Sequence, residues 1–115
     1  MKRKAMNETE ILERMRLVSL AQEMLDEKIS FFEGAAQLLV IINRLSDISD
    51  TDPDFNAFRI IRSETDHLPL KAQWPLWNST AIAALESEFK QTEEWAKSFA
   101  PQACRNIIAR FSIRD

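Results

Sequence analysis

The sequence predicts an all-α protein, a compact bundle of four to five helices. The 115 residues include only one Gly, whereas sheet proteins with many tight turns usually need several. Hydrophobic residues make up 45% of the chain, enough to form a core without disulfides or metal ions. They recur at intervals of three and four residues, the period of a helix with one buried side. We therefore expect one helical domain over residues 1–115, with residues 1–6 as a flexible tail.

Two helices are predicted in the first 45 residues. Asn7 and Glu10 have the spacing of a capping pair, and a helix is expected to follow over residues 8–27. Ser30 and Glu33 form a Ser-x-x-Glu capping box before residues 31–45, which are apolar almost all the way round and therefore belong in the middle of the bundle. The run 38–42 could instead form a buried strand, but the sequence offers no second strand to pair with it.

Three more helices are predicted further along the chain. Asp52 as N-cap and Pro53 at the first helical position mark the start of one, with Phe55, Phe58 and Ile61 on its buried side. Residues 63–77 are expected to form an irregular connection. Asn78 or Ser79 caps the next helix, whose apolar positions are Ile82, Leu85, Phe89, Ala96 and Phe99. After Pro101, a last amphipathic helix buries Cys104, Ile107, Ile108 and Phe111.

Several classes of function are disfavoured by composition. Gly34 is the only Gly, so the Gly-rich loops that bind nucleotide phosphates are absent, and one Cys with one His cannot supply a structural zinc site. A calcium loop starting at Asp50 fails, because Phe55 and Ile61 occupy the positions that need Gly and Glu. The net charge of −3 disfavours nucleic acid as a partner. We therefore expect no cofactor and no metal.

The sequence contains no apolar stretch of the length that a membrane span requires, which is about 20 residues. The basic start of the chain is followed by polar residues where a signal peptide would be apolar. A cytoplasmic protein without membrane attachment is the expectation.

The connection 63–77 contains the main candidate site residues, since long loops often have functional roles. Glu64, Asp66 and His67 could bind a divalent metal or act in a hydrolytic enzyme, or they could form a structural turn. Trp74 and Trp77 flank Pro75 and could form a binding surface or cover the end of the bundle. Cys104 is the only thiol, at a position that faces the core.

An acidic stretch precedes the third predicted helix. It contains Asp47, Asp50, Asp52 and Asp54. These residues are interpreted first as a solvated loop with a helix cap, and second as a contact surface for a basic partner.

Two segments resemble a known family. Residues 52–55 read Asp-Pro-Asp-Phe, residues 63–69 read Ser-Glu-Thr-Asp-His-Leu-Pro, and Trp77 stands before the next helix. Together they resemble a family of small uncharacterised bacterial proteins, and the resemblance implies a short helical chain without a known catalytic signature. In size, acidity and helical class the chain is also similar to immunity proteins, which neutralise a toxin from the same bacterium; this similarity is an analogy of class.

The leading functional hypothesis is a non-enzymatic, protein-binding module, most concretely an acidic immunity protein that binds a basic toxin domain. The residues expected at the contact are Arg62, Glu64, Asp66, His67, Trp74 and Trp77. One alternative is a small metal-dependent or hydrolytic enzyme that uses Glu64, Asp66 and His67. Another is a homodimer formed through the surplus apolar face of the first helix.

Overall fold

The structure is a computed structural model that describes residues 7–45 and 48–112. The described residues form helices and no strands, so the prediction of a compact all-helical bundle is confirmed for them. The strand alternative for residues 38–42 is wrong, because these residues lie within a helix. The expected tail at residues 1–6 lies outside the described part. In chain order the elements are α1 Glu8–Leu25, α2 Phe31–Ile42, α3 Pro53–Glu64, the 3-10 helix η1 Lys71–Leu76, α4 Ser79–Ala84, α5 Glu86–Ala96 and α6 Ala100–Phe111.

The predicted caps start the first three helices. The Asn7 side chain accepts a hydrogen bond from the Glu10 amide at 2.8 Å, and the Ser30 hydroxyl accepts one from the Glu33 amide at 3.0 Å. Asp52 caps α3 by accepting the Asp54 amide at 3.0 Å. These local bonds satisfy amides that have no partner within the first helical turn, which explains why the sequence patterns located the helix starts correctly.

The core lies between α1, α2, α3 and α6. Helix α1 packs against α2 and α6, and α3 packs against the same two helices from the other side. The largest side chains with almost no exposure come from all four helices: Leu17, Met24, Leu38, Phe55, Phe58, Ile61 and Ile107. Helix α2 is not enclosed all round as predicted, because the Val40 side chain on its outer face is 52% exposed.

Gly34 has a packing role in α2. A Cβ atom added to Gly34 would lie 2.3 Å from the sulfur of Met24 in α1 and 2.7 Å from its Cγ. Such distances are far inside van der Waals contact, so the methionine side chain occupies the space that any larger residue would need. The single Gly of the sequence therefore allows α1 and α2 to pack closely.

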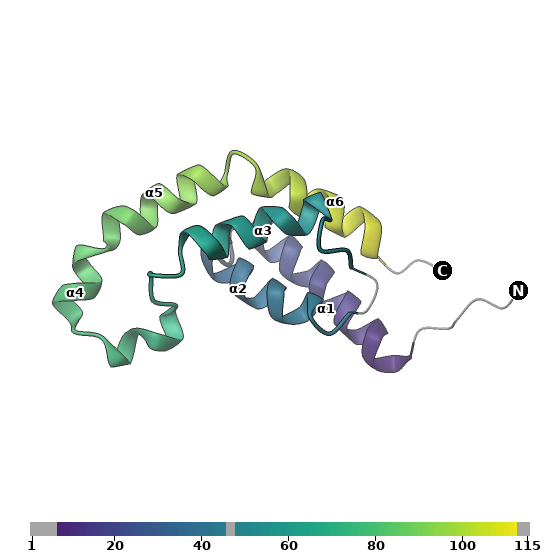
Figure 1. Cartoon of the computed structure of the whole chain (residues 1–115), viewed down its shortest axis with the longest axis horizontal. Coiled ribbons are helices and arrows are strands. Elements are labelled where there is room, and N and C mark those ends of the chain that lie inside the picture. Colours follow the sequence, from purple (N-terminus) through teal and green to yellow (C-terminus); the bar gives the residue numbers. More distant parts are fainter. Residues whose placement is uncertain (1–6, 46–47, 113–115) are drawn as a thin grey trace, which may run out of the picture.

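The remaining elements, η1, α4 and α5, form an arm that extends from the bundle. Figure 1 shows α5 leading away from α6, α4 at the far end, and η1 on the way back to α3. The molecule is therefore elongated, with principal extents of 60 × 28 × 25 Å. The described residues of η1 and α4 contribute no buried side chain, so the arm adds little to the core.

The arm departs from two predictions. The single helix expected after Asn78 or Ser79, with apolar positions as far as Phe99, is divided by a turn at Leu85, whose backbone has φ −90° and ψ −4°, and its second part ends at Ala96. The connection 63–77 is also more regular than expected, because α3 continues to Glu64 and Lys71–Leu76 form η1 with Pro75 inside it. Periodic apolar residues continue across Leu85, so the sequence alone could not show the break.

Candidate functional site

An open groove lies where the arm leaves the bundle. Its volume is about 680 Å³, and its walls come from the start of α2, from η1 and from α5. Three aromatic side chains, Phe32, Trp74 and Phe89, form its apolar floor. The ring centroids of Phe32 and Phe89 are 5.6 Å apart, and those of Trp74 and Phe89 are 6.0 Å apart. We call this site the arm groove. Its combination of an aromatic floor and an open mouth is typical of binding sites.

Glu93 attaches α5 to the first turn of α2. Its two carboxylate oxygens accept hydrogen bonds from the backbone amides of Phe31 at 2.9 Å and Phe32 at 3.0 Å. A carboxylate is favoured there because the amides of the first helical turn lack partners and carry partial positive charge. The contact fixes Phe32 and Phe89, on two separate helices, at the same site.

The η1 wall of the groove is held by three further hydrogen bonds. The carboxylate of Glu33 accepts the Lys71 amide at 2.9 Å, and the side chain of Gln73 accepts the Leu70 amide at 2.9 Å. The indole Nε1 of Trp74 donates to the carbonyl of Pro69 at 3.1 Å. The polar edge of the indole is thus satisfied on the loop, and its apolar ring remains available to the groove.

Charged side chains of both signs surround the floor. The lining contains three lysines and four glutamates: Lys71, Lys90, Lys97, Glu33, Glu86, Glu93 and Glu94. Several of them already have partners, since Lys90 pairs with Glu86 at 3.7 Å and Lys97 pairs with Glu27 at 4.0 Å. Because the charges nearly balance, the groove does not call for a strongly charged ligand.

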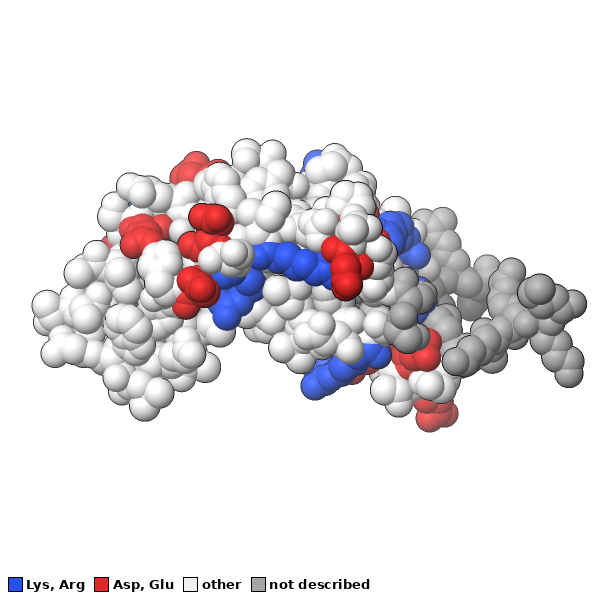
Figure 2. All heavy atoms as spheres, in the orientation of Figure 1, with Lys and Arg blue, Asp and Glu red and all other residues white. Residues whose placement is uncertain are grey.

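The far end of the arm lacks charge altogether. Residues 72–85 form the longest stretch of this sequence without Asp, Glu, Lys, Arg or His, although 29% of the whole chain is charged. We call these residues the arm tip. Its apolar side chains reach solvent, with Leu76 87% and Trp77 42% exposed. Figure 2 shows the corresponding lobe of the molecule as continuous uncharged surface. Exposed apolar surface that is not interrupted by charge is typical of interaction sites.

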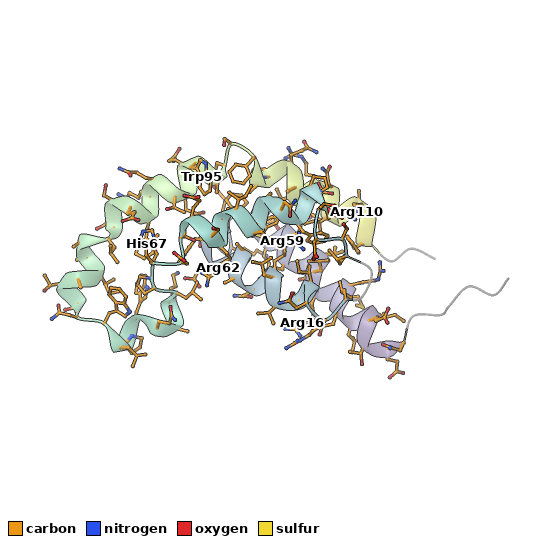
Figure 3. The ribbon with its side chains drawn as sticks, viewed as in Figure 1. Arg16, Arg59, Arg62, His67, Trp95 and Arg110 are labelled. Carbon is orange, nitrogen blue, oxygen red and sulfur yellow. The ribbon has the colours of Figure 1, made fainter. Side chains whose placement is uncertain are left out.

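His67 connects the turn after α3 with the arm. Its Nε2 is hydrogen-bonded to the carboxylate of Glu88 in α5, and its Nδ1 lies 4.0 Å from a carboxylate oxygen of Asp66. Figure 3 shows His67 between the end of α3 and the arm. Glu64 is exposed at the last position of α3. The described residues contain no group of three or more His, Cys, Asp and Glu side chains that could hold a metal ion. Glu64, Asp66 and His67 therefore form no metal-ligand cluster among the described residues.

Of the predicted binding residues, only Trp74 lines the arm groove. Trp77 lies at the arm tip, while Arg62, on the last turn of α3, is not part of the groove lining. Sequence reasoning missed Phe32 and Phe89, because apolar residues at helical spacing were assigned to the core. The charge-free stretch around Trp74 and Trp77 was the signal that could have directed attention to the arm.

Two residues of the predicted acidic surface are paired within the chain. The guanidinium of Arg110 donates to both carboxylate oxygens of Asp52, at 2.9 and 2.7 Å, and to Asp54 at 2.8 Å. Figure 3 shows Arg110 on α6 beside the start of α3. These hydrogen bonds lower the pKa of Asp52, and the same carboxylates raise that of Arg110. Asp50 is exposed, and Asp47 lies outside the described residues.

Cys104 is an inert thiol. It is fully buried in α6, and this burial raises its pKa to about 12. The thiolate, which is the nucleophilic form, is therefore essentially absent at neutral pH. A catalytic role for this cysteine is disfavoured, and the expectation that it packs as a small hydrophobic side chain agrees with its burial.

The comparisons with other proteins agree with the resemblance to a family without known function. Among the described helices, none has the length and hydrophobicity needed to cross a membrane. No curated protein and no solved structure matches this chain. None of the comparisons concerns immunity proteins. A family described as "protein of unknown function", DUF2489, matches residues 1–107, and the chain belongs to that family.

Proposed function

We propose that the protein is a non-enzymatic binding module that holds an apolar segment of a partner protein in the arm groove. The observation that supports this most directly is the aromatic floor of an open groove of about 680 Å³, in which Trp74 and Phe89 are partly exposed and pack with the buried Phe32. Tryptophan and other large aromatic side chains dominate the energetics of protein interfaces when a partner excludes water from them. Hydrogen bonds accepted by Glu93 and Glu33 join α5 and η1 to the start of α2 and so bring the groove walls together.

The partner's chemistry follows from the lining of the groove. An aliphatic or aromatic side chain would contact the floor, and polar groups next to it would meet the lysines and glutamates of the rim. Because these rim charges are mixed in sign, they would orient the partner and add modest affinity.

The test compares capture by the wild-type chain and by Phe89→Ala, each immobilised and exposed to lysate of the native host. We expect one protein to be enriched by the wild type and its capture to fall at least about tenfold with Phe89→Ala, the loss typical of an interface anchor. Trp95→Ala is the matched control, because Trp95 is an exposed aromatic residue on the same helix but outside the groove lining. Equal capture by all three chains would contradict the proposal.

In its most specific form, the proposal is that this binding module is an immunity protein and that its partner is a basic toxin domain. The net charge of −3 and the glutamates along α5 support attraction of a basic partner. Asp52 and Asp54 contribute less to such attraction, because Arg110 pairs with both. Association with a basic toxin domain should slow steeply as the salt concentration rises. An association rate that is insensitive to salt would contradict the immunity-protein hypothesis but not the more general proposal of a binding module.

A further inference from the structure

The arm carries both a groove and a surface that matches it. The arm groove offers an aromatic floor, and the arm tip, residues 72–85, offers exposed Leu76 and Trp77. Helix η1 belongs to both, since Lys71 and Trp74 line the groove and Leu76, at the other end of η1, projects into solvent. Within one chain, Leu76 and Trp77 do not line the groove. A second copy of the chain could bring its tip there.

The charge distributions of the arm groove and the arm tip are compatible with contact between them. The rim glutamates and lysines are near balance, and two of the glutamates have carboxylates occupied by backbone amides: Glu93 binds the start of α2, and Glu33 binds the start of η1. A rim of this kind does not favour a charged insert. The arm tip is the longest uncharged stretch of the chain, so it can enter the groove without burying a charge that lacks a partner.

We infer that the arm tip of one copy occupies the arm groove of a second copy, so that the protein forms a symmetric dimer through two identical tip-to-groove contacts. The inference rests on the proposed function, in which the groove holds apolar segments, and it names a second copy of this chain as the partner. Because tip and groove lie on the same arm, one twofold axis beside the two arms can satisfy both contacts at once. Such closed, reciprocal contacts are the commonest form of self-association.

A competing dimer surface exists on α1. Leu12 and Met15 on its outer face are 58% and 53% exposed, the surplus apolar face expected from the sequence. Exposed Arg16 lies on the same helix next to Met15, so this face is interrupted by charge. The arm tip has no such interruption, and the arm groove with its aromatic floor lies near it. The tip-to-groove dimer is therefore the better supported arrangement.

The experiment measures the dimer dissociation constant of the purified chain by sedimentation equilibrium. We expect Leu76→Asp, which charges the tip, and Phe89→Ala, which removes part of the groove floor, each to raise that constant at least about tenfold. Leu76 is 87% exposed, so its substitution should leave folding intact, and circular dichroism checks both variants. In an equimolar mixture the intact tip of the Phe89→Ala chain meets the intact groove of the Leu76→Asp chain, while the second contact of the mixed dimer carries both substitutions, so any mixed dimer should remain weaker than the wild-type dimer.

Control variants separate the other arrangements. Met15→Asp should leave the dissociation constant unchanged; a dimer that is lost with Met15→Asp and retained with Leu76→Asp would overturn the inference in favour of α1. Folded Leu76→Asp and Phe89→Ala chains that both dimerise as tightly as the wild type would exclude tip-to-groove contacts. A wild-type chain that is monomeric throughout the micromolar range would also overturn the inference. So would a monomeric wild-type chain that sediments with phosphatidylcholine vesicles and loses this vesicle binding with Leu76→Asp, because the tip would then bind lipid.

Failure of the dimer is distinguishable from failure of the proposed function. If the wild type is monomeric but Phe89→Ala still abolishes capture of another protein, the groove is a binding site for that protein and not for the arm tip of a second copy. If dimers form as expected but capture of the other protein does not depend on Phe89, the self-association stands and the proposed use of the groove for that partner falls.

Discussion

At the scale of single residues, Asp52 combines two roles. Its carboxylate caps α3 by accepting the Asp54 amide, and the same carboxylate receives two hydrogen bonds from Arg110 at the end of α6. Arg110 also lies over the rings of Phe55 and Phe111, with its guanidinium carbon 5.6 and 5.1 Å from their centroids. The charged contact therefore joins the start of one core helix to the end of another.

Substituting Asp52 by Asn should remove the charge while keeping a good N-cap, because Asn caps helices about as well as Asp. We expect the free energy of unfolding at neutral pH to fall by about 1 kcal/mol, the scale of a partly exposed ion pair. Urea unfolding measures this difference. Asp50→Asn is the matched control, since Asp50 is exposed near the start of the same helix and should change stability very little.

The pH dependence of this difference has a defined sign. The pKa of Asp52 is lowered in the folded state, chiefly by its hydrogen bonds with Arg110, from an ordinary value of 3.8. A lowered pKa stabilises the fold above the unfolded value and loses that contribution as the pH falls through the folded value. The wild type and Asp52→Asn should therefore differ at neutral pH and converge in acid. A constant difference over the whole pH range would contradict the role assigned to the charge.

At the scale of helices, the contact between α5 and α2 depends on one carboxylate. Glu93 accepts the amides of Phe31 and Phe32 from 62 and 61 residues away in sequence. No capping rule predicts it, because such rules consider only residues within a few positions of the helix start. The sequence pattern correctly identified Ser30 as the local cap, and the fold added a second, distant one.

Replacing Glu93 by Gln should weaken this attachment. The neutral amide keeps one acceptor oxygen instead of two and loses the attraction to the positive end of α2. We expect the free energy of unfolding to fall by about 1–2 kcal/mol, since hydrogen bonds to charged groups are among the stronger ones. Thermal or urea unfolding measures the change, with Glu94→Gln, the exposed neighbour on α5, as the control. Equal stabilities of the two variants would show that the contact contributes little.

At the scale of the whole molecule, burial is uneven. The four helices of the bundle share the core, whereas η1 and α4 have no buried side chain, and η1 is held by a few hydrogen bonds to the preceding loop and to Glu33 of α2. Regions with few buried contacts open at much lower free energy than the core. The arm should therefore open locally while the bundle stays folded.

Hydrogen exchange followed residue by residue should show this division. In dilute solution we expect the amides of α4 to exchange at least about a hundredfold faster than those of α1 and α6, because their opening does not require unfolding of the core. At concentrations where dimers form, insertion of the arm tip into a second copy should slow exchange in α4. Uniform protection across α1, α4 and α6 in dilute solution would contradict the division between arm and bundle.

The helical class and the starts of α1, α2 and α3 follow from the sequence alone. Apolar spacing and short-range caps such as Asn7, Ser30 and Asp52 act between residues a few positions apart, so they can be recognised without a fold.

The tertiary structure decided how the helices meet. Glu93 reaches α2 from a distant helix, Arg110 neutralises acids that were expected to face a partner, and Phe32, Trp74 and Phe89 gather from three elements into one groove. These contacts join residues that are far apart in the chain. Their energies depend on the distances between the side chains, which are fixed only when the helices pack together. For the same reason Leu85 and Phe89, whose spacing predicted one continuous helix with an apolar side, instead lie in an arm that leaves the bundle.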